Sequence, residues 1–297
     1  MDLRLLLLGI LLIVSCKQEP AFDVIIRNGT ILDGSGQPGF RADLGIRADT
    51  IAAIGDLAGR EAGLEVDATG LHVAPGFINM LSWATDTLIE DGRSQSDVRQ
   101  GVTLEVMGEG WSMGPFSESM KDEELARQGD IRYDITWTSL GEYLQFLEDK
   151  GVSTNVASFV GATTVRIHEL GFEDRAPTPE ELERMRSLVR TAMEEGALGV
   201  ASALIYPPGS FAETDELIAM AKVVAEYDGL YISHVRDEGA NMVGAFDELV
   251  TVAREAGVRA EIYHFKSAGH ENWEGFPEAL AVIEKARSDG LQITGDV

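Results

Sequence analysis

Two histidines, His234 and His264, have the chemistry and the placement needed to share a metal ion. Each ends a predicted strand, over residues 230–234 and 258–264, and the two strands are consecutive in the chain. Neighbouring parallel strands lie about 4.8 Å apart, and their carboxyl ends meet at the face where barrel active sites form. Two neutral imidazoles there can bind one divalent cation, with zinc as the leading candidate. A lone histidine at a strand end is more often only hydrogen-bonded, so the interpretation depends on the matched pair.

A catalytic zinc takes three protein ligands and keeps one position for water, so two histidines are too few. Glu109 stands between Gly108 and Gly110, just after a predicted strand over residues 102–107. The glycines permit close approach of the backbone, so the Glu109 carboxylate is the candidate third ligand. A loop or surface glutamate is the alternative, and Glu105 is a weaker rival because it lies deeper in the strand.

Two further residues are candidates for binding a substrate. Lys266 follows His264 by two positions, which places both on one face of a strand, and its ammonium group could hold a carboxylate. Tyr206, in Ile205-Tyr206-Pro207-Pro208-Gly209, follows another predicted strand, and its hydroxyl could donate to a developing oxyanion. A solvated lysine and a turn that only shapes the loop are the alternative interpretations.

A repeating unit of helix, glycine and strand must position these residues. Thr178-Pro179-Glu180-Glu181 supplies an N-cap, a proline at the first helical position and a capping-box glutamate. That helix is expected to stop at Gly196, before a strand over residues 198–204. The unit recurs about every thirty residues, the length of a βα unit, with helices over 214–228, 241–256 and 276–289 and strands over 230–234, 258–264 and 291–297.

Earlier strands are predicted over residues 74–80, 102–107 and 153–159, which brings the total to about seven. Alternating strands and helices favour a parallel sheet. The predicted fold class is therefore α/β: an incomplete TIM-type (β/α) barrel. A small N-terminal β-sandwich segment precedes it, in which Asn28-Gly29 predicts a hairpin turn. The domains are predicted at 1–21, 22–72 and 73–297, and strands one and seven would be left as unpaired edges.

Composition narrows the function classes. The net charge of −26 repels phosphate backbones and makes nucleic-acid binding a poor hypothesis. With 44% hydrophobic residues, the chain can bury a sizeable core. Cys16 is the only cysteine, so no disulfide framework forms within the chain.

The N-terminus resembles a bacterial lipoprotein signal. Arg4 precedes an apolar run, Leu5–Val14, which suits the h-region of a signal peptide and is short for a membrane span. Ile13-Val14-Ser15-Cys16 resembles a lipobox, in which Cys16 becomes the lipidated first residue. We expect an exported lipoprotein, anchored to a membrane and facing the periplasm or the cell exterior; a simple export signal or a short membrane anchor is the alternative.

Taken in order, the motifs resemble those of the N-acyl-D-amino-acid deacylases (D-aminoacylases) of the amidohydrolase superfamily. The resemblance runs from about residue 22 to the end. It is generic in Asp23–Gly34 and Val73–Ile78, and specific in Asp174–Thr178, Glu194–Val200, Tyr206–Leu217, Ser233–Gly239 and His264–Gly269. It implies that His234 and His264 bind one zinc ion, that Lys266 holds a substrate carboxylate, and that Tyr206 lines the site.

The chain departs from the family pattern at three places. Leu81 and Trp83 stand where the family carries a His-x-His pair, and neither offers a ligand atom suited to zinc. Gly110 aligns with the family's cysteine ligand, which makes the neighbouring Glu109 a possible substitute. The family's general-base aspartate would lie beyond Val297, and Asp296 matches a different motif.

The resemblance implies hydrolysis of the amide bond of a small N-acyl amino acid. Because the general base is missing, we expect the chain alone to have little or no deacylase activity. Three alternatives remain: another amidohydrolase acting on cyclic amides or dipeptides, a truncated reading frame, and a non-catalytic, lipid-anchored binding protein. A measurement of bound zinc distinguishes the binding protein, which need not hold zinc, from the enzyme, which requires at least one equivalent.

Overall fold

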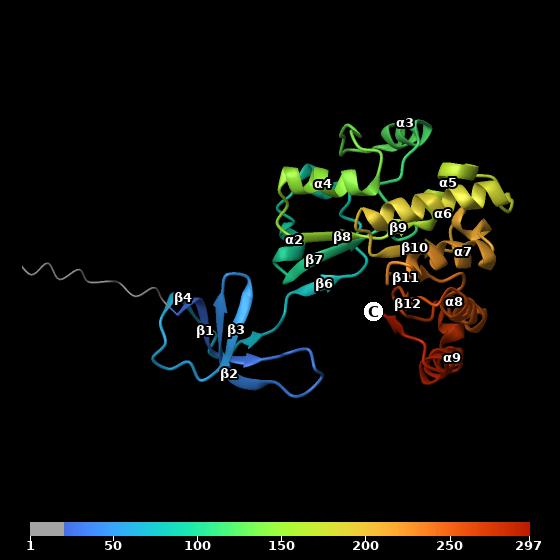
Figure 1. The fold of residues 1–297 in the computed structure, drawn as a ribbon. Helices are drawn as coiled ribbons and strands as arrows, with labels where there is room; N and C mark the ends of the chain where they lie inside the picture. Colours follow the sequence, from blue (N-terminus) through green and yellow to red (C-terminus); the bar gives the residue numbers. More distant parts are fainter. Residues whose placement is uncertain (1–20) are drawn as a thin grey trace, which may run out of the picture. The chain divides into compact units, whose positions relative to one another are not determined.

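The computed structural model describes residues 21–297 and divides the chain into two compact units, one ending at Pro75 and one spanning Gly76–Val297 (Figure 1). The signal peptide and the lipidation site predicted at Cys16 lie outside the described residues and stay predictions. In the part of the chain that is described, no helix combines the length and apolar character needed to cross a membrane.

The first unit contains one five-stranded sheet of mixed direction. The spatial order is β3 (Thr50–Gly55), β2 (Phe40–Arg47), β1 (Phe22–Ile31) and β4 (Ala62–Asp67), with β5 (His72–Val73) also paired to β1. β2 is antiparallel to β1 and β3, whereas β4 and β5 run parallel to β1. A sandwich needs two sheets packed face to face, so the predicted sandwich segment is not confirmed.

The hairpin predicted at Asn28-Gly29 is wrong, because β1 runs through both residues. The register of β1 on β2 shifts between Ile26 and Gly29, and Asn28 has φ of 61°. Asparagine tolerates this left-handed conformation. The same backbone angle serves a β-bulge as well as a hairpin turn, and here it makes a bulge.

The second unit contains two parallel sheets. β6 (Phe77–Asn79), β7 (Val102–Met107) and β8 (Asn155–Ser158) form the first; β9 (Val160–Gly161), β10 (Gly199–Ala203), β11 (Leu230–His234), β12 (Arg259–Ile262) and β13 (Ile293–Gly295) form the second. All neighbours pair in parallel. Because Phe159 alone separates β8 from β9, seven strand positions follow one another in chain order, as predicted. The α/β class with parallel sheets is thereby confirmed.

Five helices connect the strands of the larger sheet and line one side of it in Figure 1: α5 (Ala162–Leu170), α6 (Pro179–Glu194), α7 (Thr214–Ala225), α8 (Met242–Ala256) and α9 (Phe276–Ser288). The capping box predicted at Thr178 and Glu181 is present at the start of α6. The remaining helical segments are α1 (Thr87–Glu90), α2 (Gln95–Val98), α3 (Glu118–Arg127), α4 (Leu140–Lys150), η1 (Gly209–Phe211) and η2 (His270–Gly275).

Strands β10 and β11 of the larger sheet are buried on both faces. Val200 and Tyr231 belong to the main core that the helices share. Their neighbours Ala201 and Ile232 belong to a second cluster with Tyr263 on the opposite face. Successive residues of a strand point to opposite faces, so the apolar runs of β10 and β11 reflect burial on two sides, as is usual for parallel sheets.

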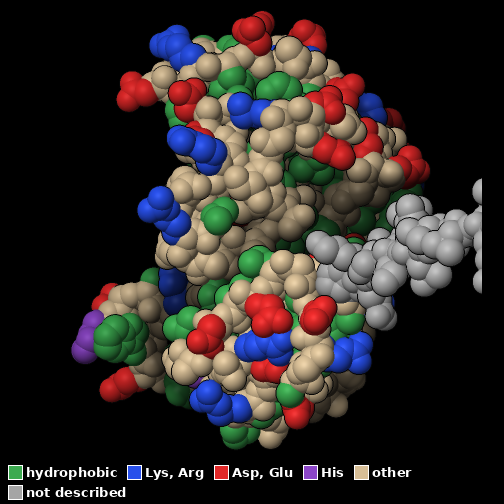
Figure 2. Space-filling model, turned by 90° about the vertical axis from the view of Figure 1, so that its left-hand side faces the viewer, with side chains coloured by type: hydrophobic (Ala, Val, Ile, Leu, Met, Phe, Trp, Pro, Cys, Tyr) green, Lys and Arg blue, Asp and Glu red, His purple; other side chains and the backbone are tan. Residues whose placement is uncertain are grey.

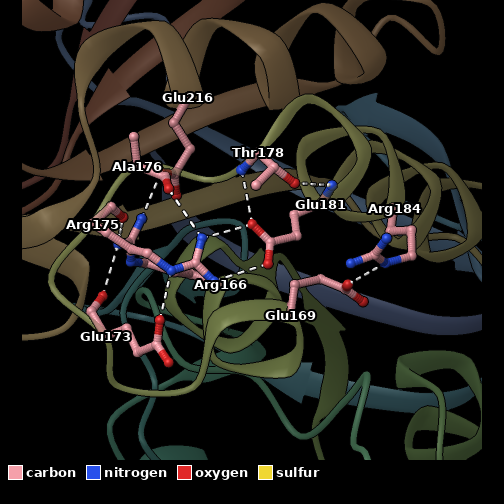
Figure 3. A network of polar contacts seen from close by, with 9 residues as sticks. All are labelled: Arg166, Glu169, Glu173, Arg175, Ala176, Thr178, Glu181, Arg184 and Glu216. Carbon is pink, nitrogen blue, oxygen red and sulfur yellow. Dashed lines mark hydrogen bonds and ion pairs between the residues drawn. The ribbon is translucent and has the colours of Figure 1, made fainter.

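A buried ion pair joins α5 to α7 (Figure 3). Arg166 Nη1 lies 2.5 Å from Glu216 Oε2, and the two side chains are only 1% and 2% exposed. Arg166 Nη2 also donates to the carbonyl oxygens of Glu173 and Arg175. Burial raises the pKa of the Glu216 carboxyl, against the effect of Arg166. The Arg166 guanidinium thus links α5 to α7 and also holds the loop that precedes α6.

Charged side chains cover the surface in both signs. Figure 2 shows Asp and Glu interspersed with Lys and Arg over the face in view. Although the net charge is strongly negative, some of the acidic side chains form ion pairs with cations. One such pair joins Arg175 to Glu181 at the start of α6.

Candidate metal centre

The two histidines meet at the carboxyl ends of neighbouring parallel strands. His234 is the last residue of β11 and is only 6% exposed. His264 lies two residues beyond the end of β12, which pairs with β11 through Ser233 and Ile262. The ring centroids are 4.4 Å apart and the planes nearly perpendicular. The predicted convergence of the two imidazoles is therefore present.

Glu109 reaches the same point from the loop after β7. Gly108, just before it, has φ of 106°, and a Cβ there would lie 2.3 Å from the carbonyl oxygen of Phe159. Only glycine fits this position without displacing the backbone. The Glu109 carboxylate is buried, and its Oε1 lies 2.7 Å from His234 Nδ1 and 3.4 Å from His264 Nε2.

Opposing effects act on the Glu109 carboxyl. Burial raises its pKa, and the hydrogen bonds and charges of His234 and His264 outweigh burial, so that the net pKa lies below the ordinary value. The group is therefore an anionic carboxylate facing two imidazoles at neutral pH.

Two of the three separations between the donor atoms are close to those of a tetrahedral zinc site, and the third is shorter. Glu109 Oε1, His234 Nδ1 and His264 Nε2 are separated by 2.7, 3.4 and 3.1 Å. Ligand bonds of about 2.0–2.1 Å at tetrahedral angles put ligand atoms about 3.3 Å apart. Two nitrogens and one carboxylate oxygen are also a usual zinc ligand set. Among the described residues, these are the histidine and acidic side chains that converge in this way.

A second carboxylate, Glu238, lies on the outer side of both imidazoles. Its Oε1 is 2.9 Å from His264 Nδ1 and 3.5 Å from His234 Nε2. Lys266 Nζ donates to the same Glu238 oxygen at 2.6 Å and lies 2.7 Å from His264 Nδ1. Sequence reasoning missed Glu238, although its position four residues after His234 could have drawn attention to it.

Asp296 was also missed as part of this site. Its side chain accepts a hydrogen bond from the backbone N–H of His264, and its carbonyl accepts one from Phe265. His264 has a left-handed φ of 36°, a conformation costly for a residue with a Cβ. Asp296, at the end of β13, thus holds this backbone in place, while burial raises the pKa of its carboxyl.

The other candidate residues lie as follows. The Tyr206 ring meets the His234 ring edge-on at 5.2 Å, and its side chain is exposed. Glu105, the weaker rival for the third ligand, is fully buried among the hydroxyls of Ser82, Ser94 and Thr154. The structure therefore brings Glu109, and not Glu105, to the histidines.

Proteins with a similar sequence include a D-aminoacylase and deacylases of N-acyl-D-glutamate and N-acyl-D-aspartate. No model of a protein family matches the chain. A D-aminoacylase of Alcaligenes xylosoxydans xylosoxydans is 37% identical over 277 residues, which are 92% of this chain and 56% of that protein.

Several solved structures are similar at 32% identity, and two of them illustrate the likeness. One is a D-aminoacylase described as defining a subset of amidohydrolases (TM-score 0.84, covering 93% of this chain and 58% of the other). The second is the N-acyl-D-glutamate deacylase of Bordetella bronchiseptica, complexed with zinc and a phosphonate inhibitor (TM-score 0.83, covering 94% and 58%).

The chain thus spans a little over half the length of the relatives that it matches. We conclude that this chain is a homologue of the D-aminoacylases and related N-acyl-D-amino-acid deacylases of the amidohydrolase superfamily.

Proposed function

We propose that this protein is a zinc-dependent hydrolase of the amide bond in N-acyl-D-amino acids. The observation that carries the proposal is the convergence of Glu109, His234 and His264 at one edge of parallel strands. Its homologues include deacylases of N-acyl-D-glutamate and N-acyl-D-aspartate, and one was crystallised with zinc.

One zinc ion is the proposed complement, held by Glu109 Oε1, His234 Nδ1 and His264 Nε2. A zinc ion bound there supplies a water of lowered pKa and polarises the substrate carbonyl. Leu81 and Trp83, which stand where the family carries a His-x-His pair, offer no donor for a further ion. In a related D-aminoacylase, one metal is described as activating and a second as attenuating.

The polar groups beyond His264 suit the amino-acid end of a substrate. The Lys266 ammonium is half exposed while it contacts Glu238 and His264. We propose that it turns to the substrate carboxylate, and that the Tyr206 hydroxyl hydrogen-bonds near the carbonyl. The carboxylate that takes the water proton and delivers it to the leaving amine is not assigned.

The seven strand positions support a barrel interpretation of the second unit. Val106 of β7, Ala201 of β10 and Ile232 of β11 share one apolar cluster with Phe159, the residue between β8 and β9. Side chains of successive strands fill the interior of a (β/α) barrel in this manner. We propose that β6 to β13 are the first seven strand positions of such a barrel.

Neutralising Glu238 is expected to weaken zinc binding by about 10- to 100-fold, as is usual when the outer partner of a ligand histidine is lost. With Nε2 of His264 bound to the metal and Lys266 turned to the substrate, Nδ1 of His264 would carry a proton and donate it to Glu238. Glu238→Gln removes that charge and keeps the shape. Zinc affinity is measured by competition with a chromophoric chelator, and ligand geometry by the visible spectrum of the cobalt form.

Glu248→Gln is the matched control for this experiment. Glu248 forms an ion pair with Arg236. Arg236 lies two residues before Glu238 in the same loop, so the Glu248 variant measures how far a disturbed loop alone lowers zinc affinity. Equal losses of zinc affinity in the two variants would show that Glu238 has no specific role toward the histidines.

The proposed function is tested with the two enantiomers of a phosphonamidate analogue of N-acetylalanine. We expect the D form to bind the zinc-loaded protein and not the chelator-treated protein, and the L form to bind at least about tenfold more weakly, which corresponds to 1.4 kcal/mol. Calorimetry gives both affinities, and hydrolysis of N-acetyl-D-alanine is followed in parallel. If both enantiomers bind equally well, with or without zinc, the proposal is contradicted and the non-catalytic binding protein is favoured.

A further inference from the structure

A pocket of about 240 Å³ opens beside Glu109, and aromatic side chains form much of its wall. Trp83 follows β6, Phe172 follows α5 and Tyr206 follows β10, and these side chains are 57%, 50% and 58% exposed. Trp111, Ile167, Ala203 and two prolines add to the apolar lining. Soluble proteins rarely expose several large aromatic side chains around one hollow unless a ligand or partner covers them.

The pocket and the amino-acid end of the substrate lie on different sides of the metal centre. Glu109 lines the pocket and faces Nε2 of His264. Lys266 and Glu238 contact Nδ1, the other nitrogen of the same ring, and neither lines the pocket. A substrate whose carboxylate meets Lys266 and whose amide carbonyl lies at the centre would therefore direct its acyl group into the pocket.

We propose that the pocket is an acyl-group subsite for a large apolar group, such as an aromatic ring, and that it disfavours an acetyl group. This inference rests on the proposed function and names its substrate class. A methyl group is close in size to a water molecule, which takes about 30 Å³, so acetyl would leave most of the pocket wet. Aromatic walls instead suit a ring, which packs edge-on or offset against them.

Arg127 supplies the guanidinium group that lines the pocket, and this group lies over the ring of Phe172. The Arg127 guanidinium carbon lies 5.7 Å from the centre of the Phe172 ring, a distance at which cation and ring attract. Arg127 also pairs with Glu123. The Arg127 guanidinium is thus engaged by Phe172 and Glu123, and most of the other lining side chains are apolar.

The test compares two analogues that differ only in the acyl part: the methyl- and benzylphosphonamidates of D-alanine. Both are titrated into the zinc-loaded protein by calorimetry. Burying a benzyl group corresponds to about a 10- to 100-fold gain in affinity over methyl. We expect Trp83→Ala and Phe172→Ala to lower this ratio at least about threefold each, with little change in the affinity for the methyl analogue.

Trp273→Ala is the control, because Trp273 is equally exposed at 59% and lies in η2, outside the pocket lining. Equal binding of the two analogues overturns the acyl subsite and leaves the proposed function standing. A benzyl preference that survives both pocket variants also overturns it. If neither analogue binds, the proposed function itself fails, and the subsite with it.

Discussion

Replacing His234 with alanine is expected to reduce bound zinc from about one equivalent to a small fraction, because two remaining donors do not hold a zinc ion at low free-metal concentration. His234 is buried, and its Nδ1 lies between Glu109 Oε1 and His264 Nε2 at 2.7 and 3.1 Å. Metal analysis after dialysis against nanomolar free zinc measures the change, with circular dichroism as the check on folding.

The control for this prediction is His270→Ala. His270 is exposed, lies in η2 and stacks near Trp273, so its removal leaves the three converging donors untouched. The two variants should therefore differ in zinc content. If the His234 variant retains a full equivalent, the ion is bound elsewhere and the ligand assignment is wrong.

Replacing Arg166 with methionine is expected to destabilise the fold by about 3–5 kcal/mol, the usual loss when one partner of a buried ion pair is removed. The substitution leaves the Glu216 carboxylate 2% exposed without its cation. The carbonyl oxygens of Glu173 and Arg175 also lose their donor (Figure 3). The midpoint and slope of urea denaturation give the free energy of unfolding.

A second substitution separates the charge effect from lost packing. Arg166→Met with Glu216→Leu removes both charges, and such replacements are often close to neutral, so we expect the pair to be more stable than the single variant. Arg93→Met, in the exposed pair with Asp91, should leave the midpoint unchanged. A single variant as stable as the wild type would mean that water reaches the Arg166–Glu216 pair.

Local signals were enough to predict much of the second unit. The capping box at Thr178 and Glu181 marked the start of α6, and the glycine after each helix marked where the next strand follows. The apolar run that ends at His234 predicted β11 to the residue. From these boundaries the meeting of His234, His264 and Glu109 followed, since parallel strands present their carboxyl ends on one edge.

The outer contacts of the site were beyond such reasoning. Glu238 and Asp296 reach His264 through the paths of the loops after β11 and β13, and no periodicity encodes those paths. The bulge at Asn28 was missed for a related reason. A positive φ has the same sequence preference in a bulge and in a hairpin, and only the pairing of β1 with its neighbours decides between them.

Anomalous diffraction at the zinc absorption edge, from crystals of the zinc-loaded protein, tests the central claim most directly. We expect one peak about 2.0–2.2 Å from Glu109 Oε1, His234 Nδ1 and His264 Nε2. A peak at other residues, or none between these three atoms in the loaded protein, would contradict it.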